Sequence, residues 1–115
     1  MEFKFEKNLR IMNDLLAYCH NRGADTYHVD IALSTELSVC RIEARLERYP
    51  EAAVSQLLEL LQTPRQHEVE DSFWGLSGDL DTDPELELIG MMVDEADVSY
   101  ANGRLVIETR RLEST

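Results

Sequence analysis

The dipeptide Asn102-Gly103 restricts the fold of this chain more than any other short segment. It lies between two runs rich in β-forming residues, 98–101 and 104–107. Asn-Gly favours a two-residue turn whose twist matches that of antiparallel strands, so the sequence predicts a C-terminal β-hairpin. On its buried face the expected pairs are Tyr100 with Leu105 and Val98 with Ile107. Further along the second strand, the residues expected to project towards water are Glu108, Arg110 and Arg111.

A second hairpin is predicted nearer the N-terminus. Two runs of alternating polarity, 27–33 and 40–46, flank the short polar link 34–36. Such alternation is typical of antiparallel strands with one face on the core and the other in water. The residues expected to face the core are Tyr27, Val29, Ile31 and Leu33, then Cys40, Ile42, Ala44 and Leu46. The phase breaks at Leu37 and Val39, which indicates a bulge or a splayed strand end.

Four segments have apolar residues at helical spacing. The first covers about residues 8–22 and stops at Gly23, and the second begins at Pro50 and ends before Pro64. The third covers about residues 66–76. The fourth follows the N-cap residue Asp83 and begins at Pro84. Gly90 within the fourth helix suggests a close approach of helix to sheet. Phe3 and Phe5 alternate with charged residues, so they form either a short strand or the lead-in to the first helix.

This order of elements predicts one α+β domain over residues 1–115. Helices with one apolar stripe and sheets with one apolar face pack most simply as a two-layer α/β sandwich. The two hairpins would form a mostly antiparallel sheet, with or without an N-terminal strand, covered on one face by helices. Cys19 and Cys40 fall on apolar faces, which is typical of reduced core cysteines in a cytoplasmic protein.

The net charge of −12 narrows the choice of partners. It opposes binding to nucleic-acid phosphates and anionic membranes, because cations supply most of the affinity for both. No apolar run approaches the roughly 18 residues that a membrane span needs. We therefore expect a basic protein partner or a second copy of this chain, and neither nucleic acid nor membrane.

Two stretches of the chain each place a helical segment before a hairpin: residues 13–18, Asn-Asp-Leu-Leu-Ala-Tyr, and residues 88–94, Leu-Ile-Gly-Met-Met-Val-Asp. Both resemble parts of the ATP-binding domain of histidine kinases and anti-sigma-factor kinases. Residues 13–18 and the hairpin after them are similar to that family's N-box helix and the strands after it. Residues 88–94 and the hairpin after them resemble its closing helix and hairpin. The resemblance implies a related fold. The nucleotide-binding motifs are missing, since Ala17 replaces the second N-box asparagine and residues 43–47 contain no Asp-x-Gly, so no binding residue is carried over.

The acidic stretch from Pro64 to Asp97 is the expected functional site. It holds the only Trp and is rich in carboxylates. Trp74, beside Gly75, is either an anchor at a binding surface or part of a helix–helix seam. A partner surface here would consist of Arg65, His67, Glu70, Asp71, Trp74, Asp79 and Asp81.

A divalent metal ion is the alternative ligand of this stretch. Alternate aspartates in the loop 79–83 imitate the start of a calcium site, but Pro84 and Gly90 stand where an EF-hand needs Gly and Glu. A His–Asp pair one helical turn apart, with Glu68 as a candidate base, imitates a zinc site. The competing interpretation is a solvated turn and an exposed acidic helix face. The candidate metal ligands are His67, Asp71, Asp79, Asp81 and Asp83.

The sequence therefore predicts a non-catalytic regulatory or protein-interaction domain that uses the acidic, Trp-bearing surface and needs no cofactor. The alternative is a metal-dependent hydrolase, or a degenerate ATP-binding relative of the histidine-kinase fold.

Overall fold

The computed structural model describes residues 3–68, 70 and 83–113. In chain order the elements are α1 (Lys4–Asn21), β1 (Tyr27–Leu33), β2 (Leu37–Arg45), α2 (Glu51–Leu61), α4 (Asp83–Gly90), β3 (Glu95–Ala101) and β4 (Arg104–Leu112). Of the predicted third helix, Gln66 is described and is not helical, residues 67, 68 and 70 are helical, and residues 69 and 71–76 lie outside the described residues. The chain from Lys4 is helical, so Phe3 and Phe5 belong to the start of α1 and not to a strand.

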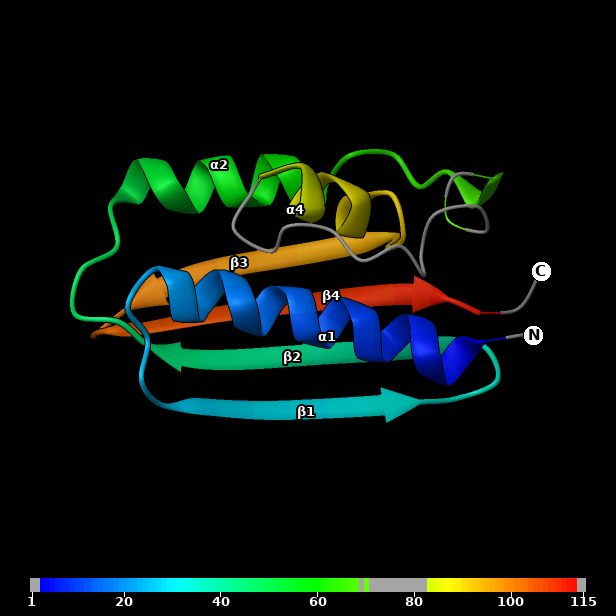
Figure 1. The fold of residues 1–115 in the computed structure, drawn as a ribbon, viewed down its shortest axis with the longest axis horizontal. Coiled ribbons are helices and arrows are strands. Elements are labelled where there is room, and N and C mark those ends of the chain that lie inside the picture. The colour runs from blue at the N-terminus through cyan, green and yellow to red at the C-terminus, as the bar shows by residue number, and fades with distance from the viewer. Residues whose placement is uncertain (1–2, 69, 71–82, 114–115) are drawn as a thin grey trace.

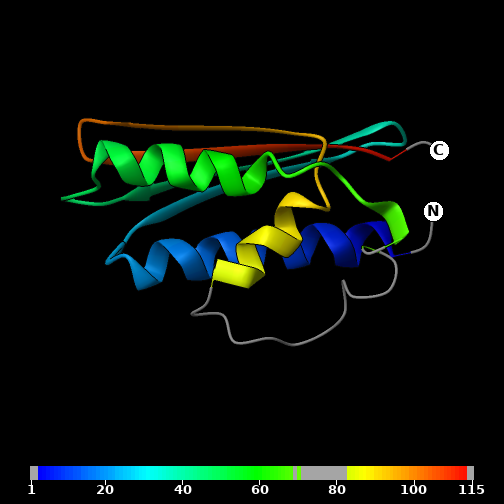
Figure 2. The same ribbon diagram turned by 90° about the horizontal axis from the view of Figure 1, so that it is seen from above.

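The four strands form one antiparallel sheet in the order β1-β2-β4-β3, with the two hairpins joined through β2 and β4 (Figure 1). Figure 2 shows that α1, α2 and α4 lie on the same side of this sheet. Helix α1 packs over β2, α2 packs along β3, and α4 contacts both helices. The predicted α+β class and two-layer arrangement are confirmed.

Both predicted turns form. Asn102 and Gly103 have φ of 55° and 76°, as the tight hairpin turn requires, and Tyr100 pairs with Leu105 and Val98 with Ile107. In the first hairpin the Ser34 amide donates to the Leu37 carbonyl at 3.2 Å. The predicted bulge is wrong, because β2 pairs without interruption from Leu37 onward. Leu37 and Val39 break the alternation because they lie on the outer face of the sheet, away from the helices.

A glycine lies at the end of α1 and another at the end of α4, and each is needed for a different reason. Gly23, with φ of 103°, follows α1, and the amides of Gly23 and Ala24 donate to the carbonyls of His20 and Cys19. This pair of bonds is the Schellman motif, in which glycine adopts the left-handed conformation most easily. Gly90 is the last residue of α4, and a Cβ there would collide with the carbonyl oxygen of Leu60 in α2. The close approach that Gly90 permits is therefore between two helices, not between helix and sheet.

The core lies between the sheet and the helices. Its strand residues alternate as predicted: Cys40, Ile42 and Ala44 of β2 and Leu105 and Ile107 of β4 are buried. Leu46 is buried as well, just beyond the end of β2. Cys19 and Cys40 are buried free thiols, as expected. On β1, Val29 faces the helix side but is 36% exposed, because β1 is an edge strand that α1 does not fully cover.

The outer face of the sheet carries ion pairs. Arg110 of β4 contacts Glu95 at 2.9 Å and Asp97 at 2.7 Å on β3, and the hydrogen bonds from these carboxylates raise the pKa of Arg110. Arg41 of β2 lies 3.7 Å from Glu108. Glu108 and Arg110 thus occupy the outer face that the sequence predicts for them. Among the described residues, no helix is long and apolar enough to cross a membrane.

Candidate functional site

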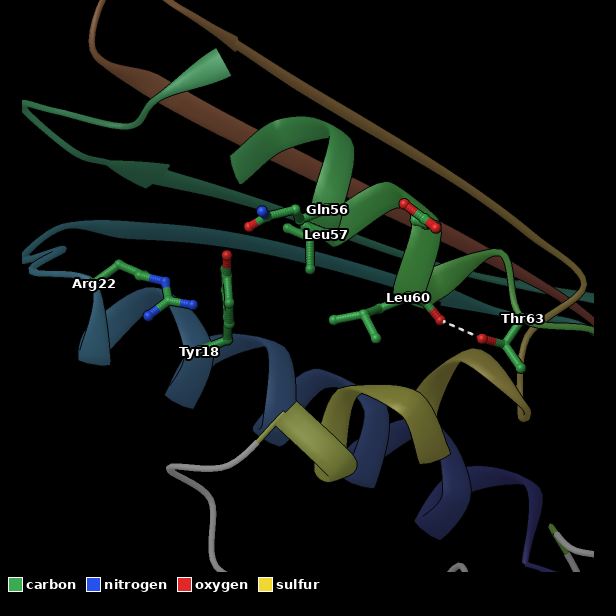
Figure 3. A pocket seen from close by; sticks show the side chains of 7 residues that line it. Tyr18, Arg22, Gln56, Leu57, Leu60 and Thr63 are labelled. Atoms are coloured by element: carbon green, nitrogen blue, oxygen red, sulfur yellow. Dashed lines mark hydrogen bonds between the residues drawn. The ribbon is translucent and has the colours of Figure 1, made fainter. Parts of the chain in front are cut away.

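An open pocket of about 610 Å³ lies between α1 and α2 (Figure 3). Tyr18 of α1 and Arg22, which caps that helix, form one wall. The other wall comes from α2 and the residues just after it. The lining residues are Tyr18, Arg22, Gln56, Leu57, Glu59, Leu60 and Thr63. This is the largest of the described pockets, and it lies away from the acidic stretch in which the sequence places the site.

A hydrogen bond joins Tyr18, which lines this pocket, to the buried Tyr49. The hydroxyl oxygens of Tyr18 and Tyr49 are 2.6 Å apart, and the Tyr49 hydroxyl lies 3.3 Å from the carbonyl oxygen of Ala53. A phenol has one proton, so either Tyr49 donates to Tyr18, or Tyr18 donates to Tyr49 while Tyr49 donates to Ala53. Burial, together with the hydrogen bond between the two tyrosines, raises the pKa of Tyr49 well above its ordinary value, so the phenol stays neutral. The hydrogen-bonded chain ties α1 to the first turn of α2.

The rim of the pocket is polar. The guanidinium carbon of Arg22 lies 4.6 Å from the centre of the Tyr18 ring, a cation–π contact. Thr63 donates to the carbonyl oxygen of Leu60 at 2.9 Å, the dashed line in Figure 3. Gln56 and Glu59 are exposed on α2. An aromatic and aliphatic floor beneath a rim with both charge signs suits a side chain that has an apolar stem and a polar end.

A buried ionic cluster lies where α1 begins and β4 ends; it consists of Lys7, Asn8, Arg65, Glu70, Arg111 and Glu113. Glu70 is 2% exposed and accepts from Lys7 at 2.9 Å, from Arg111 at 3.2 Å and from Arg65 at 3.2 Å. Burial alone would raise the pKa of Glu70, but the hydrogen bonds from Arg111 and Lys7 outweigh it and hold the pKa below its ordinary value. Glu70 is therefore ionised and internally paired.

Arg111 and Glu113 complete the cluster. Arg111 is 1% exposed and donates to Glu113 at 3.2 and 3.3 Å and to the carbonyl oxygen of Met92 at 2.6 Å. Asn8 donates to Glu113 at 2.9 Å. Burial raises the pKa of Glu113, but the hydrogen bonds from Arg111 and Asn8 lower it by a larger amount. The pKa of Glu113 therefore lies below its ordinary value. For Arg111, burial lowers the pKa, but the bonds to Glu113 and Glu70 give a net increase.

Arg65 joins this cluster to the segment before β3. Its guanidinium donates to Asp94 at 2.7 Å and to the carbonyl oxygen of Leu112 at 2.8 Å, while Asp94 accepts from the Leu112 amide at 2.6 Å. The side chain of Arg65 is 6% exposed. These contacts hold the chain after α2 against the end of β4.

The predicted partner surface is only partly visible. Glu70 was expected on an exposed acidic helix face; this expectation is wrong, because three cations of the core surround its carboxylate. Arg65 pairs with Glu70 and Asp94. His67 is exposed. Asp71, Trp74, Asp79 and Asp81 lie outside the described residues, so their binding role stays a prediction.

The predicted metal site is likewise described only in part. His67 is the one candidate ligand whose side chain is described; that of Asp83 is not, although its backbone begins α4. Within the described ranges, no group of three or more His, Cys, Asp or Glu side chains could hold a metal ion. Metal binding by residues 67–83 stays a prediction.

Sequence reasoning missed residues of both sites, among them Arg111, Lys7, Tyr18 and Tyr49. Arg111 was expected in water, yet it shares strand parity with Leu105 and Ile107, which face the helices. That parity could have predicted its burial. Lys7 is followed at helical spacing by buried Ile11, so its helical position was a similar signal. The pairing of Tyr18 with Tyr49 has no local signal, because the two tyrosines are 31 residues apart.

Comparison with known proteins adds no family. No family model matches this chain, and no curated protein matches its sequence. The resemblance to the ATP-binding domain of histidine kinases stays a prediction.

Proposed function

We propose that this protein is a non-catalytic interaction module that binds a basic segment of a protein partner, and that the pocket between α1 and α2 receives one side chain of that segment. The observation that carries the proposal is the composition of the pocket. Leu57, Leu60 and the Tyr18 ring offer apolar contact, and the exposed carboxylate of Glu59 stands at the rim. A lysine or arginine has a matching form, with an apolar stem and a charged end.

The distribution of charge supports the same partner class. The chain carries 23 acidic and 11 basic residues. Lys7, Arg65 and Arg111 direct their charges into the buried ionic cluster, and Arg110 is shared among carboxylates of the outer sheet face. A partner approaching from solvent therefore meets a surface on which carboxylates predominate. Such a field attracts cationic segments and speeds their association.

The tyrosines give the pocket a fixed shape. The hydroxyl groups of Tyr18 and Tyr49 are hydrogen-bonded to each other, which holds the Tyr18 side chain in position before a partner binds. The Arg22 side chain lies over the face of the Tyr18 ring and holds that side of the pocket in place. A pocket that is formed before binding loses little conformational freedom on binding, which favours affinity.

The test measures binding of short peptides to the intact chain. Peptides with a central Lys or Arg are titrated by calorimetry against peptides in which that residue is Glu. We expect the basic peptides to bind and the acidic ones not to bind. Glu59→Lys should weaken the affinity by about tenfold, since it replaces attraction by repulsion at the rim.

Glu36→Lys is the matched control, because it changes the net charge equally at an exposed hairpin turn outside the pocket lining. Loss of binding in Glu59→Lys alone supports the pocket. Equal losses in both variants would mean that only net charge acts, and the pocket proposal would then be wrong. Absence of binding by all basic peptides would contradict the proposal as a whole.

A further inference from the structure

We propose that β1 is the interface of a symmetric homodimer, in which the β1 strands of two copies pair antiparallel about Val29 and join two four-stranded sheets into one. This inference rests on the edge of the sheet and not on the pocket between α1 and α2. Figure 1 shows β1 at one margin of the sheet, with β2 on its other side.

The hydrogen-bonding pattern of β1 shows which backbone groups face this margin. The amide of Arg45 donates to the carbonyl of Thr26, and the amide of Ser34 donates to the carbonyl of Leu37. In an antiparallel pair, residues that bond to the neighbour alternate with residues that point away. Even-numbered residues of β1 therefore bond to β2. The backbone N–H and C=O groups of Tyr27, Val29, Ile31 and Leu33 point to the open edge.

Side chains on β1 leave this edge accessible. His28, Val29, Asp30 and Ala32 are exposed, and Val29 is 36% exposed although it faces the helix side. Proteins usually protect an edge with lysine, proline, a bulge or a very short strand. β1 spans seven residues, Tyr27–Leu33, and contains no lysine or proline, and its pairing with β2 is continuous. The edge is therefore able to receive another strand.

The opposite edge of the sheet differs. The core-facing residues of β3 are more covered, since Ala96 is 4% exposed and α2 packs along the strand. Glu95 and Asp97 add two carboxylates to β3, and their side chains are 68% and 73% exposed. Charge and helix cover make this edge a poor template for pairing.

Charge complementarity selects the second copy as the partner and sets the register. Symmetric pairing through the edge-facing residues can be centred on Val29, on Asp30 or on Ile31. Centring on Asp30 places two carboxylates opposite each other, which is unfavourable. Centring on Val29 places His28 of each copy opposite Asp30 of the other. An imidazole donates a hydrogen bond to a carboxylate in either protonation state, so this register gains two polar pairs.

The same register continues the pattern within each copy. On the outer face, Asp30 is the cross-strand neighbour of Arg41, and His28 is the neighbour of Glu43. Across the dimer, Arg41 and Asp30 of one copy would lie next to His28 and Glu43 of the second copy. Hydrogen-bond donors and acceptors would then alternate along the outer face. On the helix side, Val29 would meet Val29 and Tyr27 would meet Ile31, which covers apolar surface that is now exposed.

The test is cross-linking of cysteine variants of the full chain under mild oxidation. Directly opposed residues that exchange hydrogen bonds have Cα atoms about 5.5 Å apart. This separation suits a disulfide, which needs roughly 4.4–6.8 Å between Cα atoms. Val29→Cys should therefore form a covalent dimer. Ile31→Cys is the matched control on the same face of the strand, and the native thiols are buried and should give no background.

Sedimentation and amide exchange give independent measurements. The wild-type chain should dimerise as its concentration rises, and Val29→Lys should abolish dimers without unfolding the monomer. Ser99→Lys, on the other edge strand, should leave dimerisation unchanged. In the dimer, the amides of Val29 and Ile31 should become protected, whereas those of His28 and Asp30 are already bonded to β2.

Three results would overturn the inference. The first is a chain that stays monomeric at the highest concentration reached. The second is cross-linking of Ile31→Cys or Asp30→Cys in preference to Val29→Cys, which would refute the register. The third is protection of Val29 and Ile31 only when a foreign peptide is added, which would make the edge a site for another protein. A monomer that still binds basic peptides would contradict this inference alone and leave the proposed function standing.

Discussion

Arg111 stands in a position where a charge is costly unless it is fully paired. Its guanidinium donates to both oxygens of Glu113, to Glu70 and to the Met92 carbonyl. Moving a cation out of water costs several kcal/mol, and hydrogen bonds to carboxylates in a low-dielectric site offset that cost. Arg111 also provides most of the pairing for Glu113. The two groups therefore stabilise each other only as a set.

Replacing Arg111 by methionine should destabilise the fold strongly. Arg111→Met fills similar space but leaves Glu113 with Asn8 and without a cation, and we expect a loss of about 3–5 kcal/mol in the free energy of unfolding. Urea denaturation would measure this loss. Arg104→Met is the control, because Arg104 is mostly exposed and should change stability by only about 0.5 kcal/mol or less. Equal effects of the two variants would show that the buried ionic cluster contributes little.

The two cysteines should be unreactive in the folded chain. Burial raises the pKa of Cys19 to about 12 and that of Cys40 to about 11. Since the thiolate is the reactive form, almost none is present at neutral pH, and the sulfur atoms are also shielded from reagent. We expect negligible labelling by a thiol reagent in buffer and two labelled sites in urea. Rapid labelling of either thiol in native buffer would contradict their placement in the core.

At the scale of elements, Gly90 controls how closely α4 approaches α2. A Cβ at this position would lie 3.3 Å from the Leu61 Cα and would collide with the Leu60 carbonyl. Gly90→Ala must push the two helices apart, although alanine is the better helix former. We expect a net loss of about 1–3 kcal/mol, which is typical of overpacking. Ser55→Ala, on the exposed side of α2, is the control and should be nearly neutral in the same urea denaturation measurement.

The hairpins could be predicted because their information is local. Asn102-Gly103 sets both the turn and the register, and Tyr100 and Leu105 pair as that turn requires. Alternation over Cys40 to Ala44 places the inward face correctly. Gly23 ends α1 where the apolar stripe ends. In each case a few neighbouring residues determine the structure, and tertiary contacts add to the same preference.

The buried ionic cluster could not be predicted in this way. Lys7 and Glu70 are 63 residues apart, and Asn8 and Glu113 are 105 residues apart. A charged residue at a core-facing position is expected in water unless its buried partner is known, and for this reason Arg111 was expected in water. The exposure of Val29 has a similar origin, since strand polarity predicts the face of a residue but not its position at the edge of the sheet.

At the scale of the whole molecule, two electrostatic effects oppose each other in acid. The chain carries a net charge of −12, so protonating exposed carboxylates relieves self-repulsion and favours the compact state. Glu70 and Glu113 act in the other direction, because their pairing with Arg111 is lost when they are protonated. Which effect dominates depends on pH. Because the pKa values of Glu70 and Glu113 are lowered, exposed carboxylates take up protons first, and Glu70 and Glu113 do so at lower pH.

Stability should therefore stay level or rise slightly between pH 7 and about 5 and then fall below about pH 4, where glutamates in the unfolded chain, with a pKa near 4.3, take up protons. The folded pKa values of Glu70 and Glu113 lie lower, so their contribution is fully present above the unfolded value and is lost as the pH falls through the folded values.

Urea midpoints measured from pH 7 to 2 would trace this curve. Glu113→Gln removes one of the two linked groups, so it should be less stable at pH 7 and should lose stability less steeply in acid. If the variant kept the wild-type slope, Glu113 would not be one of the groups whose protonation unfolds the protein, and the acid limit would have to come from repulsion among the remaining cations.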